Sequence, residues 1–266
     1  MEKKEKEEHV MPNAVQKAML ILRALSDGRE HPLTVSAISE ATGIHTSTVA
    51  HILKELCTEG YVLRVSHREG YVIGPELHLL TRYGRYGEPL IRACHSVMRW
   101  LNRECGVTVV LAVIEGSRKY IIDRVGDDRI YLDKEASILS DGLYRTATGR
   151  VILSRMPIHS ALEVFEELGL PEGEWPQVRS REEFLSALAE IRRENCYYHS
   201  FCKDFRWYSW AVPIIKEREC VGALGVLIRQ ELAETPPTED EKKRISALVE
   251  RGRREITRRL RLEWDA

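Results

Sequence analysis

The sequence predicts an α+β protein in which an N-terminal winged helix-turn-helix domain precedes a larger domain built on an antiparallel sheet. Helix-type apolar spacing fills residues 13–59, strand-type runs flank a polar loop over 61–73, and strand and helix patterns share the rest of the chain. We expect a flexible N-terminus at 1–9, the winged helix-turn-helix domain at 10–75, a linker helix at 76–89 and the second domain at 90–266. In the second domain we expect helices at 90–103, 147–155, 160–168 and 181–192, strands at 107–114, 119–125, 129–132, 210–215 and 221–228, and a last helix that starts at Thr238 with a capping box to Glu241.

The helices of the first domain can be placed from their capping residues. Asn13 is a suitable N-cap for the first helix, and Thr34 or Ser36 opens a short second helix that ends before Gly43. A third helix is predicted over residues 46–59. The turn between the second and third helices requires a left-handed residue, and glycine adopts that conformation without a Cβ clash. Gly43 therefore fits a helix-turn-helix.

The third helix would carry polar residues on its exposed face and N-terminal end, where base edges in a major groove are read. The hairpin after it adds basic side chains suited to phosphate or minor-groove contacts. The predicted DNA-binding residues are Thr46, Ser47, Thr48, His51 and Lys54 on the helix, and Arg64, His67 and Arg68 on the hairpin. Residues 10–75 hold six basic and six acidic side chains, so this domain has no net charge. A protein-interaction module is the alternative.

Several short motifs follow one another along both domains. They are VQKA at 15–18, ISEATGI at 38–44, STV at 47–49, EGYV at 59–62, YVIGP at 71–75, DRV at 123–125, TATGR at 146–150 and AVPI at 211–214. In their order and spacing these motifs resemble the IclR family of bacterial transcriptional regulators, from residue 14 nearly to the end of the chain. The family's recognition helix commonly carries basic residues where this chain has Ala50 and His51.

The resemblance implies a ligand-responsive, cytoplasmic transcriptional regulator that is not an enzyme and needs no cofactor. Its implied partners are a palindromic double-stranded DNA operator, a small-molecule effector, and further copies of the chain in a homodimer or homotetramer. The second domain would then be a GAF-like α/β domain for effector binding and oligomerisation. We expect the helices of residues 76–103 to couple the two domains by changing the spacing of the DNA-binding heads.

The effector site is expected around the start of a helix at residues 146–149, because free amides and the helix dipole attract a carboxylate there. Arg145 could add charge. Alternatively, Thr146 or Thr148 acts only as an N-cap of this helix, a role that is compatible with effector binding. The predicted effector-binding residues are Tyr144, Thr146, Ala147, Thr148, Gly149, His199, Trp207, Ser209, Gly225 and Leu227.

Residues 196–210 contain seven of the nineteen aromatic side chains of the sequence. Such a segment suits an apolar binding pocket with a few polar anchors, although a stacked aromatic core or a subunit interface is almost as good an explanation. The resemblance implies that relatives binding small oxo-acids carry an acidic residue, a cysteine and two serines where this chain has His199, Ser209, Gly225 and Leu227. We therefore expect a larger or aromatic acid as effector.

Other function classes lack support in the sequence. There is no nucleophile–base pair or paired-carboxylate motif of an enzyme and no phosphate-cradling glycine motif, and the scattered cysteines and isolated histidines do not predict a metal site. The longest apolar run is too short to cross a bilayer, and the charged N-terminus does not resemble a signal peptide, so no membrane partner is expected. A redox switch between Cys196 and Cys202 is the remaining alternative to small-molecule sensing.

Overall fold

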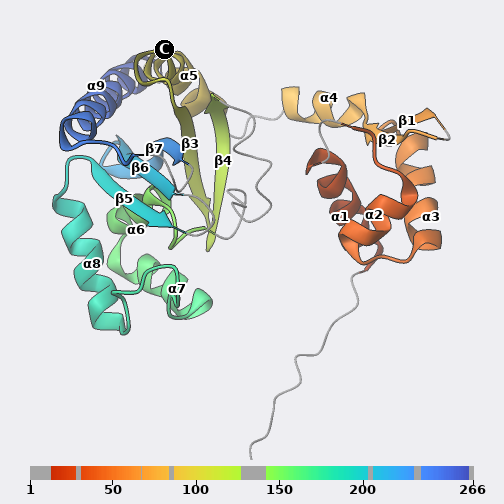
Figure 1. Cartoon of the computed structure of the whole chain (residues 1–266), viewed down its shortest axis with the longest axis horizontal. Helices are drawn as coiled ribbons and strands as arrows, with labels where there is room; N and C mark the ends of the chain where they lie inside the picture. Colours follow the sequence, from red (N-terminus) through yellow and green to blue (C-terminus); the bar gives the residue numbers. More distant parts are fainter. Residues whose placement is uncertain are drawn as a thin grey trace, which may run out of the picture. The chain divides into compact units, whose positions relative to one another are not determined.

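The structure is a computed structural model that describes residues 13–27, 31–66, 68–83, 87–126, 142–202, 206–230 and 235–263. Its chain divides into two compact units, Met1–Tyr86 and Gly87–Ala266, which are coloured along the sequence in Figure 1. The predicted linker at 76–89 holds most of one helix of the first unit, which ends at Tyr83, and the start of another in the second unit, which begins at Glu88.

The first unit has the predicted order of three helices, a hairpin and a further helix. Its elements are α1 (Ala14–Asp27), α2 (Val35–Thr42), α3 (Thr46–Thr58), β1 (Val62–Ser66), β2 (Gly70–Ile73) and α4 (Pro75–Tyr83). Ile21, Ile38, Val49 and Leu53 are fully buried between the first three helices and the hairpin. The apolar spacing that predicted these helices thus forms one core.

The predicted caps of these helices are confirmed. Asn13 Oδ1 accepts a hydrogen bond from the Gln16 amide at 2.9 Å, and Gln16 Oε1 accepts one from the Asn13 amide at 2.8 Å. Thr34 Oγ1 caps α2. Gly43 follows α2 with a φ of 68°, the left-handed conformation expected between the two helices of the motif.

The β1–β2 hairpin is joined to the helices through two backbone hydrogen bonds. The Leu33 amide donates to the Tyr71 carbonyl at 3.0 Å, and the Tyr71 amide donates to the Leu33 carbonyl at 2.9 Å. A Cβ atom on Gly70 would lie 2.3 Å from the Leu33 carbonyl oxygen, and Gly70 also has a φ of 107°. Glycine is therefore required at this position.

The second unit contains a five-stranded antiparallel sheet in the order β4-β3-β7-β6-β5. Its strands are β3 (Thr108–Glu115), β4 (Arg118–Val125), β5 (Tyr197–Cys202), β6 (Arg206–Lys216) and β7 (Glu219–Gln230). Its helices are α5 (Glu88–Cys105), α6 (Ala147–Arg155), α7 (Ile158–Leu168), α8 (Arg181–Arg193) and α9 (Glu239–Glu263). The sequence predicted every one of these elements except β5. The strand expected at 129–132 lies outside the described residues.

Helices cover both faces of this sheet (Figure 1). α5 and α9 pack on one face over a core that includes Trp210, and α6, α7 and α8 cover the other face around Phe184. The capping box predicted for the last helix is present, because Thr238 Oγ1 accepts from the Glu241 amide at 3.2 Å and the Glu241 carboxylate accepts from the Thr238 amide at 2.7 Å.

Candidate functional site

The first candidate site is the exposed side of α3. His45 is the N-cap of this helix, and its Nδ1 atom accepts from the Ser47 amide at 3.4 Å and lies 2.9 Å from the Ser47 hydroxyl. Val49 and Leu53 are fully buried against the other helices, so the opposite side of α3 faces solvent. The Thr48 and Val49 amides of the first turn donate to the His45 carbonyl at 2.9 and 3.0 Å, so the exposed side chains of this turn are the groups available to a phosphate.

The structure brings most of the predicted DNA-binding residues to this surface and to the hairpin beside it. Those on α3 are Thr46, Ser47, His51 and Lys54, which are exposed, and Thr48, which is half-buried. On the hairpin, Arg64 is exposed with its guanidinium 5.5 Å from the centroid of the Tyr71 ring, and Arg68 is exposed in the turn that the Ser66 hydroxyl caps. His67 lies outside the described residues.

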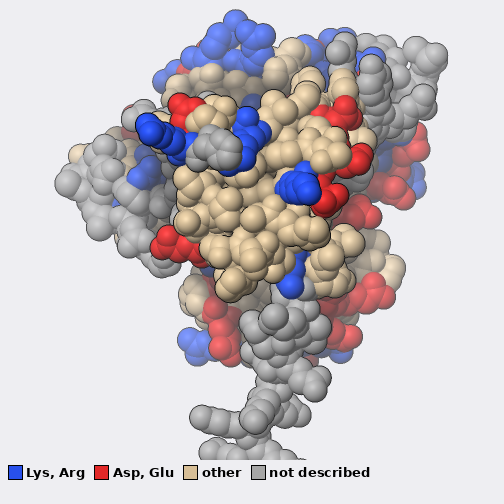
Figure 2. Space-filling view, turned by 90° about the vertical axis from the view of Figure 1, so that its right-hand side faces the viewer, with Lys and Arg blue, Asp and Glu red and all other residues tan. Residues whose placement is uncertain are grey.

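Charge is sparse on this side of the molecule. Figure 2 looks onto the side that carries α3 and β1 in Figure 1, and uncharged surface occupies the middle of the view. Lys and Arg side chains are scattered over it and do not merge into one basic patch. Any contact with a phosphate backbone would thus involve a few basic side chains, with hydroxyl groups beside them.

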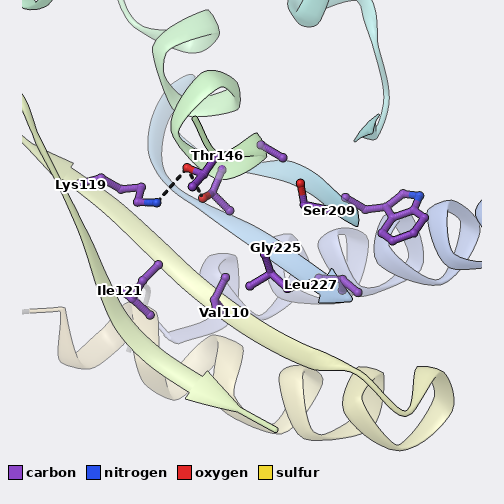
Figure 3. Close-up of a pocket in the computed structure, with 11 residues that line it drawn as sticks. Val110, Lys119, Ile121, Thr146, Ser209, Gly225 and Leu227 are labelled. Carbon is purple, nitrogen blue, oxygen red and sulfur yellow. Dashed lines mark hydrogen bonds between the residues drawn. The ribbon is translucent and has the colours of Figure 1, made fainter. Parts of the chain in front are cut away.

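The second candidate site is a pocket in the second unit between the sheet and the start of α6 (Figure 3). Its volume is about 30 Å³, which suits a carboxylate group or a few water molecules but not a benzene ring, for which a cavity of about 150 Å³ is known to suffice. The lining residues are Val110, Lys119, Ile121, Thr146, Ala147, Thr148, Ser209, Trp210, Gly225, Val226 and Leu227.

Lys119 places a buried cation at the edge of this apolar pocket. Its side chain extends from β4 toward the start of α6 (Figure 3), the residue is 1% exposed, and its Nζ atom donates to Thr146 Oγ1 at 2.8 Å. The pKa of Lys119 is lowered to about 7, chiefly by burial; the Glu174 carboxylate opposes this change and the Arg145 guanidinium adds to it. Near neutral pH this amine therefore exists in both protonation states.

Thr146 organises the helix end that faces Lys119. Its hydroxyl donates to the Gly142 carbonyl at 2.7 Å and accepts from the Gly149 amide at 3.2 Å, as an N-cap does. The first turn of α6 holds no acidic residue. The positive end of the helix dipole and the Lys119 ammonium thus meet in one place, which is the arrangement that holds an anion.

Arg150 fixes α6 from within the same unit. The residue is 1% exposed, its guanidinium donates to the carbonyls of Tyr144 at 2.6 Å and Glu174 at 2.7 Å, and it lies 4.3 Å from the centroid of the Trp175 ring. Burial lowers its pKa from the usual value. The buried cation ties both segments to the helix.

His199 completes this buried polar network. Its Nδ1 atom lies 3.1 Å from Arg150 Nη1, and because a guanidinium can only donate, Nδ1 accepts and Nε2 carries the proton. Burial and the Arg150 charge lower the pKa of His199 to about 4, so the ring is neutral at physiological pH. Nε2 is buried without a hydrogen-bond partner in the described part of the chain, as is the Tyr144 hydroxyl.

The aromatic-rich segment forms a ladder on the α6 side of β5 and β6. The rings of Tyr197, His199, Phe201 and Trp207 follow one another with centroids 6.3, 5.9 and 6.0 Å apart in near-parallel planes. His199 pairs with Ser209 across the two strands, and the Ser209 hydroxyl donates to the His199 carbonyl at 3.1 Å. The ladder therefore lies beside the pocket, because Ser209, the strand partner of His199, lines that pocket.

The structure gathers some of the predicted effector-binding residues around the pocket and leaves others outside its lining. Six of the ten line it, namely Thr146, Ala147, Thr148, Ser209, Gly225 and Leu227. Tyr144, His199 and Trp207 lie in the surrounding buried network and ladder. Gly149 has a packing role, since a Cβ atom there would lie 2.1 Å from the Leu143 carbonyl oxygen.

Lys119 is the residue that sequence reasoning missed. A signal for it exists, because Lys119 and Ile121 are two apart on a strand and so share a face. Ile121 packs against the core beneath α6. A lysine on the same face of a strand as a core isoleucine is a candidate buried cation.

The geometry overturns the alternative of a disulfide switch between Cys196 and Cys202. Cys202 ends β5, and Cys196 directly precedes this six-residue strand. An extended strand of that length separates them by about 20 Å, whereas disulfide-linked Cα atoms are about 5.5–6 Å apart. Burial also raises the pKa of Cys196 to about 12, so its thiol is unreactive at neutral pH.

No helix within the described ranges is long and apolar enough to cross a membrane. Within those same ranges, no group of three or more histidine, cysteine, aspartate or glutamate side chains is placed to hold a metal ion.

Two family models match this sequence. The IclR helix-turn-helix domain matches residues 14–66, and the bacterial transcriptional regulator IclR C-terminal domain matches residues 87–234. Among curated relatives, the HTH-type transcriptional regulator Rv1719 of Mycobacterium tuberculosis is 31% identical over 145 residues, which are 54% of each chain. The regulator KdgR of Escherichia coli is 26% identical over 69% of each chain. The chain thus spans about half the length of the first of these relatives.

Solved structures share the fold. The IclR protein of Thermotoga maritima matches with a TM-score of 0.66 and 22% identity, covering 93% of this chain and 98% of its own. An IclR homologue from Microbacterium hydrocarbonoxydans in complex with 4-hydroxybenzoate matches with a TM-score of 0.69 and 17% identity, over 94% of this chain and 100% of its own. The predicted α+β fold class, with a helix-turn-helix domain before an IclR-type C-terminal domain, is confirmed.

Proposed function

Because the chain belongs to the IclR family of transcriptional regulators, we propose that it is a ligand-responsive regulator that binds DNA through residues 10–75 and senses a small organic acid through residues 90–266. The observation that carries the DNA-binding part is α3, which holds its apolar side in the core and presents Thr46, Ser47, His51 and Lys54 to solvent after a glycine turn.

The proposed operator is palindromic, and the protein would bind it as a homodimer or as a homotetramer built from two dimers. One α3 helix reads only a few base pairs, so helix-turn-helix proteins gain affinity by placing two heads on symmetric half-sites. Residues 76–89 would connect each head to the domain that senses the effector and holds the copies together. Effector binding acts only through a difference in affinity between DNA-competent and incompetent arrangements.

An acid is the proposed effector class because the pocket combines a buried lysine with a helix N-terminus. An aromatic acid such as 4-hydroxybenzoate, which the Microbacterium homologue binds, would need the pocket to widen by on the order of 100 Å³. The unpartnered Nε2–H of His199 lies in the network beside the pocket and could then bind a ring hydroxyl. A two- or three-carbon acid would fit with less rearrangement.

DNA binding is tested by selecting duplexes from a random library with the full chain and measuring affinity by fluorescence anisotropy. We expect two symmetric half-sites in the selected duplexes. Lys54→Ala and Arg68→Ala should weaken binding and reduce the slope of log affinity against log salt by about one each. Lys243→Ala, on the exposed side of α9, is the matched control. Enrichment of no duplex would contradict DNA binding.

The second candidate function, a protein-interaction module, is favoured by the uncharged middle of the α3 side in Figure 2 and by the zero net charge of residues 10–75. DNA selection separates the two functions. A protein-interaction module would enrich no sequence and would show at most weak binding that disappears at physiological salt.

A further inference from the structure

The amine of Lys119 has unused hydrogen-bonding capacity inside the pocket. An ammonium group has three donors, and the described chain offers it one acceptor, Thr146 Oγ1 at 2.8 Å. Lys119 is nevertheless 1% exposed, so water does not satisfy the other donors as it would on the surface. A buried ammonium in this state is costly unless an anion joins it.

The described charged groups around Lys119 leave its positive charge unbalanced. Among the described residues, Glu174 and Arg145 are the neighbours that influence it, and they pair with each other at 2.7 Å, so no described carboxylate belongs to the lysine alone. His199, from β5 on the same side of the sheet, is neutral because its pKa is about 4. The first turn of α6, whose N-cap Thr146 bonds to Lys119, adds partial positive charge at the same place.

We propose that Lys119 is the anchor for the carboxylate of a small organic acid, which the lysine ammonium and the first-turn amides of α6 hold together, and that Lys119 takes up a proton when the acid binds. This inference rests on the proposed function of the second unit as a sensor, and it assigns the effector's charged group to one side chain. Gly225 contributes room, since a Cβ atom there would lie 2.5 Å from Thr148 Cγ2.

Proton uptake follows from the state of the empty pocket. With a pKa of about 7, Lys119 is mostly protonated at pH 6 and mostly neutral at pH 8. A carboxylate stabilises the protonated form and raises the pKa. Binding at pH 8 must therefore draw a proton from solution, and the apparent affinity for the acid should fall about tenfold between pH 6 and pH 8.

The test is calorimetric titration of the full chain with acetate, pyruvate, benzoate and 4-hydroxybenzoate at pH 6 and pH 8. Each titration at pH 8 is repeated in triethanolamine and in Tris, because these two cationic buffers release protons with different heats and do not compete for an anion site. We expect at least one acid to bind with net proton uptake at pH 8 and with about tenfold higher affinity at pH 6. Lys119→Met should lose both the affinity and the pH dependence, and Lys119→Arg should keep affinity without proton uptake, because an arginine stays protonated.

Lys243→Met, which removes an exposed lysine of α9, is the control and should behave as the wild type. An acid that binds Lys119→Met as tightly as wild type, or binds wild type with no proton uptake, overturns the inference even if that acid still changes operator affinity. Failure of all four acids to bind wild type overturns it as well. Failure of the proposed regulatory function has a different signature: an acid binds with proton uptake, but no duplex is selected or its affinity does not respond.

Discussion

Replacing Lys119 by methionine should stabilise the second unit. The increase in the free energy of unfolding should be larger at pH 6 than at pH 9. Methionine fills nearly the same volume as lysine and needs no hydrogen-bond partner. The lysine has a pKa of about 7 in the folded chain and about 10.4 in the unfolded chain. Between these values the unfolded state binds more protons, so the stability of the wild-type protein must rise with pH in that window.

The size of the effect follows from the two pKa values. Below pH 7 the folded state carries the full cost of the buried charge, which for a pKa lowered from 10.5 to about 7 is about 5 kcal/mol. From pH 6 to pH 9 the wild type should recover about 2.5 kcal/mol of this cost. Loss of the bond to Thr146 offsets the methionine gain by about 1 kcal/mol at every pH, so the change with pH is the sharper measurement.

Urea unfolding followed by tryptophan fluorescence reads the second unit selectively in the full chain, because all five tryptophans of the sequence lie after residue 86. The free energy of unfolding is measured for wild type and Lys119→Met at pH 6, 7, 8 and 9. The difference in the free energy of unfolding between Lys119→Met and wild type should shrink by about 2.5 kcal/mol from pH 6 to pH 9. Parallel curves would show that Lys119 keeps an ordinary pKa and would refute the reasoning from burial.

Three further changes test other parts of the structure. Gly149→Ala should destabilise the second unit by about 3 kcal/mol in the same urea assay, because its Cβ atom would lie 2.1 Å from the Leu143 carbonyl oxygen; a neutral effect would mean that α6 can shift. Thr34→Ala should cost about 1 kcal/mol of first-unit stability, measured by circular dichroism, through loss of the α2 cap, and an unchanged transition would argue against it. At pH 8 a thiol reagent should label exposed Cys202 well before Cys196, whose pKa burial raises to about 12; equal rates would contradict that burial.

Local signals in the sequence were sufficient for most elements. Helix starts were predictable because the capping groups lie within three residues of the amides they bind, as Asn13 and Thr238 show. The turn at Gly43 was predictable because a φ of 68° selects for glycine. The pocket wall formed by residues 146–148 was also predictable from a local signal, because a helix start carries its own anion-binding groups.

Such local signals did not predict β5 as a strand. Strand alternation is normally visible as apolar and polar residues taking turns, but rings occupy both faces here. His199 and Phe201 stack on the α6 side, while Tyr198 packs on Trp210 at 5.1 Å within the core under α9. A segment with aromatic side chains on both faces has no polar side from which to read its period, so the ladder became evident only with the strand pairing.

Lys119 shows why the charged part of the pocket was harder to predict than its helix. β4 is an edge strand of the sheet, and lysine on an edge strand ordinarily blocks pairing with other chains while staying in water. What distinguishes this lysine is its contact with Thr146, 27 positions later in the chain, which depends on the placement of α6 over the sheet. Arg150 and Gly149 determine that placement, one through its bonds to the Tyr144 and Glu174 carbonyls and the other through its close approach to Leu143. The anion-binding character of the pocket therefore depends on packing between distant segments, and variants that loosen α6 should raise the pKa of Lys119 by letting water reach it.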